Sequence, residues 1–513
     1  MGKTIDSVMR YLLLVARVCI VIAAIIVTAI SLIWTVSTDY GETSFTFSTS
    51  SCWIVALSAI IFVLLLAFTP FIRVLTMLGT KCLSIYAGLI SGLIAIIWVF
   101  AANVGVVWDS LDLWVAANDP DAVQWEHAGY MERYPYQASM IAALRICQWF
   151  AGSNALLLFQ LGNAVCVGLA SWTTVRLVHE WTQDDHAASI AAVLQIMFLP
   201  PALYATFVYG NQFALTFVLI AFLFQAMGFN TNKLPWHCMS ALAMLVAIIA
   251  KRTFTIAVVA LVLSWLIYAL KKNDWKIVFP ILITLALTLI IPTSIDSAIL
   301  HRYKANPNNA LPKTTWLVMG LGANNNGTLS KYQQLGMFDG YTVKIPADSY
   351  SPERQTELNQ KLVSRRLSHF KDDPLDAAHF IAKKLVYEWG DPTYGSITAS
   401  NWTRGTTPPI SDRPKTVIAN SVYDGKLHTI IVFLMDTFAS IISFGYLAAF
   451  LSSKNKYKYW GIAFCITGGF LLYIAWEAKS QYTLPFVQLM IPYAAIGIQL
   501  LTESLTRKRL FRK

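Results

Sequence analysis

The amino-acid sequence predicts an all-α polytopic membrane protein with about twelve transmembrane helices. Of its 513 residues, 56% are hydrophobic and only 13% are charged, against roughly 25% charged residues in an ordinary soluble domain. Apolar runs recur along the chain, and most of them approach the roughly 20 residues that a helix needs to cross a bilayer. Composition and the length of the apolar runs together therefore indicate a membrane protein and exclude a soluble enzyme.

Twelve apolar runs are the expected spans. The first run follows Lys3 and Arg10 and has no small-residue cleavage site, so we expect a retained span and not a removed signal peptide. The run 239–250 is short, and a re-entrant or partly unwound segment is the alternative for it. The expected spans are 11–35, 53–71, 83–107, 154–178, 187–208, 213–229, 239–250, 253–270, 278–294, 430–451, 460–475 and 484–501.

The distribution of Lys and Arg orients these spans. The formal net charge of +11 is explained first by cytoplasmic loops and anionic lipid head groups, and not by nucleic acid. With the N-terminus in the cytoplasm, the densest basic segments, 271–276, 454–458 and 507–513, all fall inside. We therefore expect a multi-pass protein of the cell membrane with both termini cytoplasmic. Lys251 and Arg252 then lie at an outer turn, where two cations need a specific reason.

Three regions follow from this arrangement. Residues 1–295 form an N-terminal transmembrane region with a catalytic outer loop at 108–153, and residues 427–513 form a C-terminal transmembrane region with a basic cytoplasmic tail. Between them, residues 296–426 form a small, mostly helical extracytoplasmic segment. Two amphipathic helices are expected within it, at 353–371 and 375–389. In the second, Phe380, Leu385 and Trp389 share one side, and Lys383 and Lys384 lie on another.

The stretch 108–137 concentrates carboxylates at the mouth of a span, where charges are costly and usually have a function or a partner. A partly desolvated carboxylate there, Asp109 or Asp112, is suited to act as a general base toward an acceptor hydroxyl. The alternative is that either acid only caps the next helix or pairs with Arg133. For Asp119 and Asp121, which flank a proline, an ordinary turn is the simpler interpretation.

Cations and aromatics near this stretch are candidates for holding a phosphorylated, lipid-linked donor. Arg133 is suited to bind phosphate, and the tyrosines of the Tyr-Pro-Tyr turn that follows it are suited to stack on a sugar or line a lipid groove. Tyr134 and Gln137 are the donor-binding candidates of this piece. Interfacial aromatics in a turn are the alternative. Lys251 and Arg252 are further phosphate ligands, or else cations that extend from a helix end toward water.

Near the C-terminus, Glu477, Lys479 and Tyr482 place an acid, a cation and a hydroxyl close together between two spans. They are candidates to close the donor site from the far side, and a surface ion pair is the alternative. The histidines lack the i, i+4 spacing of a helical metal site. No cofactor follows from the motifs, and a divalent metal stays open.

Taken in order, these stretches resemble the GT-C class of integral-membrane glycosyltransferases, in particular bacterial proteins related to the dolichyl-phosphate-mannose protein mannosyltransferases. The resemblance extends to an uncharacterised Gram-positive branch of that class. It covers the topology of nearly the whole chain but only short motifs. The stretches that carry it are 109–112, 116–117, 133–135, 316–320, 336–339 and 477–482.

The resemblance implies a GT-C-like fold, a polyprenyl-phosphate-linked sugar donor, inversion at the anomeric carbon, and a glycan or glycolipid acceptor outside the cell. It makes Asp109 the matching catalytic carboxylate. Two departures are evident. The acidic loop follows the third span instead of the first, and Asp109 is followed by Ser110 where many members have paired acids. Asp109 and Asp112 therefore remain alternatives as the base.

The predicted function is thus transfer of a sugar in cell-envelope glycan or glycolipid assembly, with membrane lipids as further partners and no nucleic acid. One alternative is a flippase or transporter of lipid-linked oligosaccharide, which would favour buried charges within spans and internal repeats. The other is a polysaccharide ligase or polymerase, which would use a diphosphate-linked glycan. Ionisable residues crowd the outer loops instead, which favours the transferase.

Overall fold

The structure is a computed structural model of the chain, and it describes residues 2–38, 45–49, 52–68, 70–118, 130–323, 335–345, 350–402, 417–452 and 459–510. Within these ranges almost every residue belongs to a helix, which confirms the predicted all-α class. The long apolar helices are α1 (Gly2–Ile33), α2 (Cys52–Phe68), α4 (Gly79–Ala102), α8 (Ala155–Thr182), α9 (Asp185–Met197), α11 (Asn211–Thr231), α12 (Leu234–Ala250), α13 (Thr255–Lys272), α14 (Val278–Arg302), α21 (Lys426–Leu451), α22 (Gly461–Ala475) and α23 (Ser480–Leu510).

Each expected span corresponds to one of these helices. Eight described helical segments are long and apolar enough to cross a membrane. The bent pair formed by α9 and α10 (Pro200–Leu203) would make a ninth. Three shorter apolar helices, α2, α12 and α22, correspond to the other expected spans, and the exact total of twelve stays a prediction. The break lies between α9 and α10, at an angle of 42°, and not in the short run 239–250, which is one continuous helix.

Glycines allow close helix contacts within the bundle. A Cβ atom at Gly168 of α8 would lie 2.7 Å from the carbonyl oxygen of Gly88 on α4. A Cβ at Gly497 of α23 would overlap the carbonyl oxygen of Gly445 on α21. Small residues bring helix backbones together in this way where lipid offers no hydrophobic driving force for helix association. The two pairs therefore fix the positions of α4 and α23, which both lead to the site.

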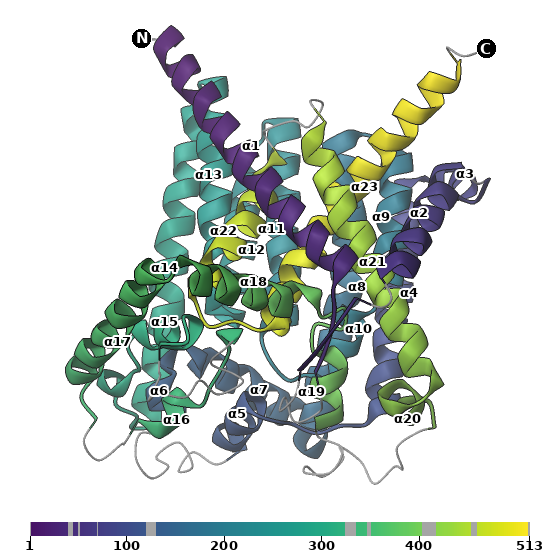
Figure 1. Cartoon of the computed structure of the whole chain (residues 1–513). Coiled ribbons are helices and arrows are strands. Elements are labelled where there is room, and N and C mark those ends of the chain that lie inside the picture. Colours follow the sequence, from purple (N-terminus) through teal and green to yellow (C-terminus); the bar gives the residue numbers. More distant parts are fainter. Residues whose placement is uncertain are drawn as a thin grey trace.

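Apart from α3 (Pro70–Met77), which lies toward the opposite end, the remaining elements lie toward one end of the bundle, which we call the site end (Figure 1). Helix α1 begins and α23 ends at the opposite end. The elements outside the long helices are α3 (Pro70–Met77), α5 (Asp109–Asn118), α6 (Tyr130–Arg133), α7 (Ala138–Ala151), α15 (Thr314–Gly320), α16 (Tyr341–Lys344), α17 (Pro352–Asp372), α18 (Pro374–Gly390), α19 (Ser396–Trp402), α20 (Val417–Asp424), and the antiparallel strands β1 (Thr35–Thr38) and β2 (Phe45–Ser48).

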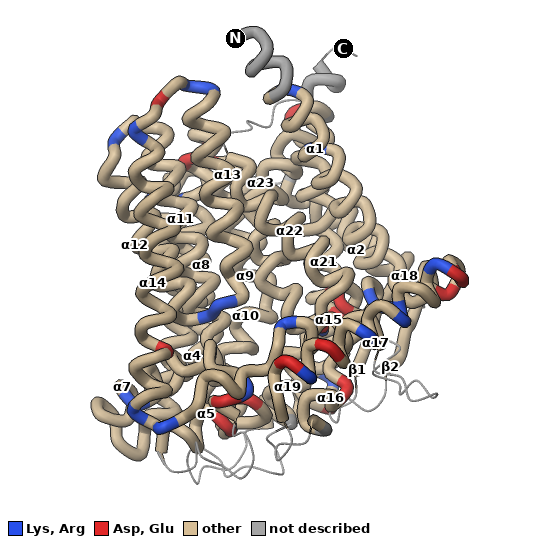
Figure 2. Tube along the Cα trace, turned by 90° about the vertical axis from the view of Figure 1, so that its left-hand side faces the viewer, with Lys and Arg blue, Asp and Glu red and all other residues tan. Residues whose placement is uncertain are grey.

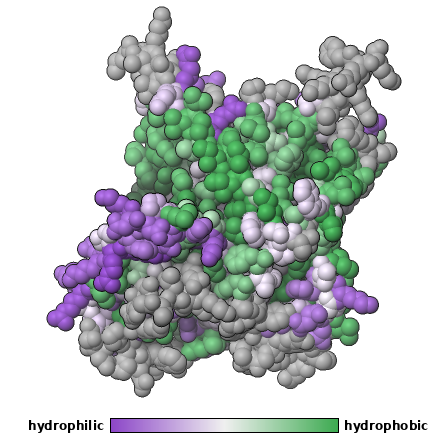
Figure 3. Space-filling view, viewed as in Figure 1, coloured by the Kyte–Doolittle hydropathy of each residue, from purple (hydrophilic) through white to green (hydrophobic). Residues whose placement is uncertain are grey.

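Charge and hydropathy divide the molecule along its long axis. Lys, Arg, Asp and Glu lie mostly toward the two ends of the bundle, with few between them (Figure 2). An apolar belt crosses the face seen in Figure 3, above the hydrophilic surface of α17. An apolar belt between two charged ends is the surface of a protein that crosses a bilayer several times. The assignment of the site end to the outside of the cell stays a prediction.

The two amphipathic helices predicted between residues 353 and 389 are confirmed as α17 and α18. Phe380, Leu385 and Trp389 are buried as expected. The placement of Lys384 on the polar side of α18 was wrong, because its side chain is only 1% exposed while that of Lys383 is exposed. The short strand pair was not predicted.

Candidate functional site

A left-handed turn places Asp109 at the first position of α5. Helix α4 ends at Ala102, and the next residue, Asn103, has a left-handed φ of 45°. The chain then runs without helix to Trp108, which has a φ of 51°. The backbone amide of Leu111 donates to the Trp108 carbonyl at 2.8 Å and so closes the first turn of α5. An acid in a first turn also suits the positive end of the helix dipole. The carboxylate of Asp109 is consequently presented at the surface of the site end, where it is exposed.

Asp109 and Lys251 both contact a buried tyrosine, Tyr209. The hydroxyl of Tyr209 donates to Asp109 Oδ2 at 3.3 Å, and the Nζ of Lys251 lies 3.7 Å from the centroid of the same ring. The Gln137 side-chain amide in turn donates to the Tyr209 hydroxyl. Lys251 follows the last residue of α12, so the two cations that broke the expected charge pattern lie at the site end. Burial lowers the pKa of Lys251 to about 8, and the charges of Asp109 and Glu477 oppose that shift.

A second lysine and a second acid complete the cluster from the loop between α22 and α23. The Nζ of Lys479 lies 4.7 Å from the centroid of the Trp108 ring, next to Asp109 in the chain. Glu477 is 4% exposed, and its Oε1 accepts no hydrogen bond from any described group. Burial raises the pKa of Glu477 to about 7, with Lys479 and Lys384 opposing the shift. We call Asp109, Tyr209, Lys251, Glu477 and Lys479 the site cluster.

Aromatic side chains border the site cluster. The rings of Trp316 and Trp476 are nearly parallel, with centroids 6.2 Å apart. Tyr134 and Tyr136 approach Trp316 with centroid distances of 6.2 Å and 6.3 Å. The Glu477 amide donates to the Trp316 carbonyl at 2.9 Å, so this aromatic wall is attached to the loop that carries the acid.

Asp112 lies one turn farther along α5. Its side chain is exposed, yet desolvation by its neighbours, followed by the charge of Asp109, raises the pKa of its carboxyl to about 6. Tyr482, in the first turns of α23, lies within electrostatic range of Glu477, Asp109 and Tyr209. Asp119 and Asp121 lie outside the described residues.

Two expected phosphate ligands are engaged elsewhere. Arg252 forms an ion pair with Asp296 of α14, and Asp296 also accepts the backbone amide of Ser139. Arg133 donates from its guanidinium to the carbonyl of Thr342 at 3.2 Å. Of the four cations predicted to bind phosphate, Lys251 and Lys479 have described contacts beside Asp109, with the rings of Tyr209 and Trp108.

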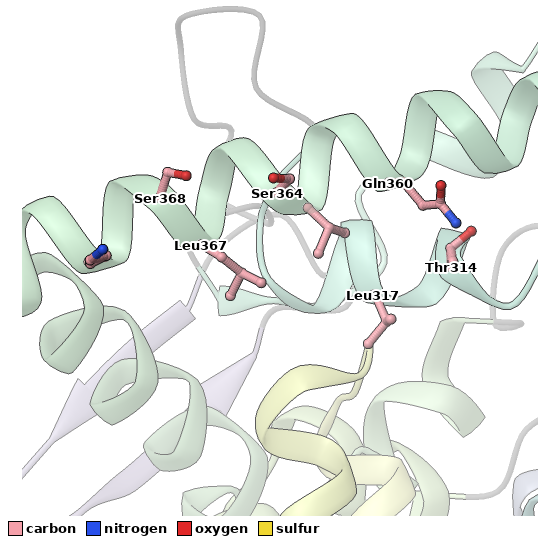
Figure 4. A pocket seen from close by; sticks show the side chains of 8 residues that line it. Thr314, Leu317, Gln360, Ser364, Leu367 and Ser368 are labelled. Atoms are coloured by element: carbon pink, nitrogen blue, oxygen red, sulfur yellow. The ribbon is translucent and has the colours of Figure 1, made fainter.

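A cleft of about 470 Å³ lies apart from this cluster, between α15 and α17 (Figure 4). Its lining carries one cation and no carboxylate, so it lacks the acid that proton transfer requires. The residues that line the cleft are Thr314, Leu317, Gln360, Val363, Ser364, Leu367, Ser368 and Lys371.

Within the described ranges, no group of three or more His, Cys, Asp and Glu side chains is placed to hold a metal ion.

Sequence reasoning missed Tyr209, Trp316 as part of an aromatic wall, and the buried pair of Lys384 and Glu388. Tyr209 offered no local signal, because its partners are about a hundred and about forty residues away in the chain. Lys384 and Glu388 did carry a signal, since an opposite-charge pair at i and i+4 on an amphipathic helix can lie on its inner face.

No protein-family model and no curated protein sequence matches this chain. Its structure is similar to that of the oligosaccharyltransferase of Archaeoglobus fulgidus in the apo form, with 12% sequence identity and a TM-score of 0.41. The alignment covers 85% of this chain and 52% of the other, so the chain spans about half the length of that enzyme.

The structure is also similar to that of ArnT from Cupriavidus metallidurans. For the apo state the identity is 14% and the TM-score 0.33, with 81% of this chain and 76% of the other covered. For ArnT bound to undecaprenyl phosphate the values are 13%, 0.30, 84% and 78%.

Proposed function

We propose that this protein is a membrane glycosyltransferase that moves a sugar from a polyprenyl-phosphate donor to an acceptor hydroxyl at the site end. The observation that supports this most strongly is that Asp109 and Lys251 both contact Tyr209, while Lys479 lies beside Trp108. An acid and two cations at the end of an apolar helix bundle match a donor with a lipid tail and an anionic phosphate.

Lys251 and Lys479 are the proposed ligands of the donor phosphate. Lys251 belongs to the end of an apolar helix, so a phosphate beside it has its lipid chain at the level of the membrane. With a pKa of about 8, Lys251 is mostly protonated at neutral pH. Both ammonium groups lie over aromatic rings, which hold cations without neutralising them. We expect both positive charges to attract the anionic phosphate of the donor.

Asp109 is the proposed general base. It takes the proton of the acceptor hydroxyl as that oxygen forms a bond to the anomeric carbon, and the bond from that carbon to the phosphate oxygen breaks. The phosphate leaves with the bonding electron pair and is stabilised by the two lysines. Attack opposite to the leaving group inverts the anomeric configuration. The hydrogen bond from Tyr209 orients the carboxylate without consuming its second oxygen. Asp112 remains the alternative base.

The sugar is proposed to lie between Asp109 and the aromatic wall. Glu477 Oε1 is a hydrogen-bond acceptor that no described group occupies, and sugar hydroxyls are donors that would satisfy it. The rings of Tyr134, Tyr136, Trp316 and Trp476 offer apolar surface next to that acceptor. A ligand with apolar faces and many hydroxyls combines both properties.

The test uses the full-length protein in lipid vesicles with a polyprenyl-phosphate-linked sugar, labelled in the sugar, and envelope glycan or glycolipid as acceptor. The proposal expects a labelled glycosidic product and one free polyprenyl phosphate for each sugar transferred. Movement of intact labelled lipid across the bilayer without product would contradict it and indicate a flippase. Activity only with a diphosphate-linked glycan would contradict it in favour of a ligase or polymerase.

A further inference from the structure

Lys384 is a buried lysine in the segment outside the long apolar helices. It belongs to α18, where its side chain is 1% exposed, and the adjacent Lys383 is exposed. A buried ammonium group is costly unless it is paired and fully hydrogen-bonded. A methionine would fill the same volume without that cost. The position of a charge there therefore needs a reason beyond packing.

The ammonium of Lys384 joins the ends of two helices. It donates to the carbonyl oxygens of Gly320 and Trp476, each at 2.7 Å, and its Nζ lies 3.4 Å from the carbonyl oxygen of Ile474. Gly320 is the last residue of α15, and Ile474 and Trp476 are at the end of α22. Carbonyls at a helix C-terminus lack partners within the helix, and a cation is their most favourable donor.

Glu388 supplies the countercharge one turn along α18, with its Oε1 3.8 Å from the Lys384 Nζ. Neither of its oxygens has a hydrogen bond to a described group. Glu388 is thus an electrostatic partner, while the directed hydrogen bonds of Lys384 all go to backbone carbonyls. Burial lowers the pKa of Lys384 and raises that of Glu388, each to about 8.

The backbone held by Lys384 leads directly into the site cluster. Glu477 and Lys479 follow Trp476, and the amide of Glu477 donates to Trp316 on the same α15. Gly320 packs against this loop so closely that a Cβ atom there would lie 2.4 Å from the Glu477 nitrogen. The loop therefore has little freedom as long as the three carbonyls converge on one ammonium group.

We propose that Lys384 is a positioning residue, which holds the loop 474–479 so that Glu477 and Lys479 face Asp109 across the site. The inference rests on the proposed function for its catalytic consequence, but the position of the loop can be measured without any transfer reaction. It assigns to α18 a role in forming the site, although no residue of α18 touches the site cluster through a described hydrogen bond.

The first experiment measures the loop directly. Glu477→Cys is made alone and combined with Lys384→Met, Lys384→Arg or Lys383→Met in the full-length protein in nanodiscs. The rate at which a water-soluble maleimide labels the new thiol is followed by peptide mass spectrometry, which separates it from the seven native cysteines. We expect at least a fivefold faster rate with Lys384→Met, a smaller rise with Lys384→Arg because a cationic donor remains, and no change with Lys383→Met.

An unchanged labelling rate in the Lys384→Met background would overturn the inference. If the elution profile shows that the Lys384→Met variant does not fold, Lys384→Arg serves as the test. The inference is then overturned if Lys384→Arg labels at the same rate as the protein that carries Glu477→Cys alone, and if its donor KM, measured with Glu477 present, is unchanged. In transfer assays with Glu477 present, we expect Lys384→Met to raise the donor KM at least tenfold and Lys384→Arg to recover part of that loss. A purely structural lysine would lower the active fraction and leave KM unchanged, which would count against positioning.

Failure of the proposed function gives a different pattern. In that case the wild-type protein makes no product from the labelled donor, while the labelling rates still depend on Lys384 and not on Lys383.

Discussion

The carboxylate of Asp109 and the ammonium of Lys251 contact the same side chain, that of Tyr209. The hydroxyl of Tyr209 donates to the acid and its ring lies under the cation. A single residue thus holds the proposed base and a proposed phosphate ligand in fixed relative positions. The charge of Asp109 also acts on Lys251, where it opposes the fall in the lysine pKa that burial causes.

Tyr209→Phe separates these two roles. The ring remains for Lys251, while the hydrogen bond to Asp109 is lost. Because a hydrogen bond to a charged group contributes roughly 1.5–3 kcal/mol, we expect kcat to fall about tenfold or more with little change in the donor KM. The measurement is steady-state transfer at saturating and limiting donor. A larger effect on KM than on kcat would contradict the assignment.

The neighbouring cations Lys251 and Arg252 should behave differently when each is replaced by methionine. Lys251→Met removes a proposed phosphate ligand, so donor affinity should fall roughly tenfold to a hundredfold with the melting temperature unchanged. Arg252→Met leaves Asp296 buried without its partner, which should cost about 3 kcal/mol of stability.

The control for this pair is the double variant Arg252→Met with Asp296→Asn, which removes both charges and should recover part of the lost stability. Donor affinity is measured by binding of a polyprenyl phosphate, and stability by thermal unfolding. Equal loss of donor affinity in the two single variants would show that Arg252 also binds the phosphate.

Glu477 should make stability depend on pH. Its pKa is raised by burial from 4.5 to about 7, so the folded state holds more protons than the unfolded state between those values. The stabilisation is complete below about pH 4.5 and is lost as the pH rises through 7, by roughly 3 kcal/mol in total. The charged groups that act on this carboxyl are Lys479, Lys384, Asp109, Asp339, Lys251 and Glu388.

The check is thermal unfolding of the wild type and of Glu477→Gln from pH 5 to pH 8. The melting temperature of the wild type should fall more steeply with rising pH than that of the variant. Glu388 titrates in both proteins, and the charge of Glu477 raises the pKa of Glu388. The difference between the two slopes therefore reports Glu477 together with its effect on Glu388. Parallel slopes would mean that Glu477 keeps an ordinary pKa.

Gly320→Ala should damage the site through the backbone. The new methyl group would lie 2.3 Å from the carbonyl oxygen of Ala475 and 2.4 Å from the Glu477 nitrogen, so the loop must move. Overpacking of this kind typically costs 1–3 kcal/mol, and transfer activity should fall strongly. Gly468→Ala in α22 is the control, because its methyl group would meet only the side chain of Ile256, at 3.2 Å. Similar activity in both variants would show that the loop position does not matter.

Much of the fold could be predicted from the sequence because it depends on local patterns. Apolar runs of sufficient length identified the long helices, and Pro374 with its preceding acids marked the start of α18. The amphipathic period of α17 likewise gave its bounds nearly to the residue. The bend between α9 and α10 was missed, since two prolines within an apolar run do not by themselves show where a span breaks.

The candidate site could be predicted only in part. Asp109, Lys251, Glu477 and Lys479 were identified because charges are rare at the ends of apolar runs. Their common partner Tyr209 could not be identified, because one tyrosine in an apolar sequence is indistinguishable from many others. The ion pair between Arg252 and Asp296 was missed for the same reason: pairing across forty residues depends on how helices pack, which no local pattern encodes.

Single-turnover transfer by Asp109→Asn tests the central claim most directly. The full-length variant is loaded with labelled polyprenyl-phosphate sugar, and product is followed over time beside the wild type, Asp112→Asn and the surface control Glu357→Gln. A general base typically contributes 10²–10⁴-fold, so Asp109→Asn should retain donor binding and lose roughly a thousandfold in rate, while Glu357→Gln matches the wild type. A wild-type rate in Asp109→Asn, or the large loss falling on Asp112→Asn alone, would contradict the assignment of Asp109 as the base.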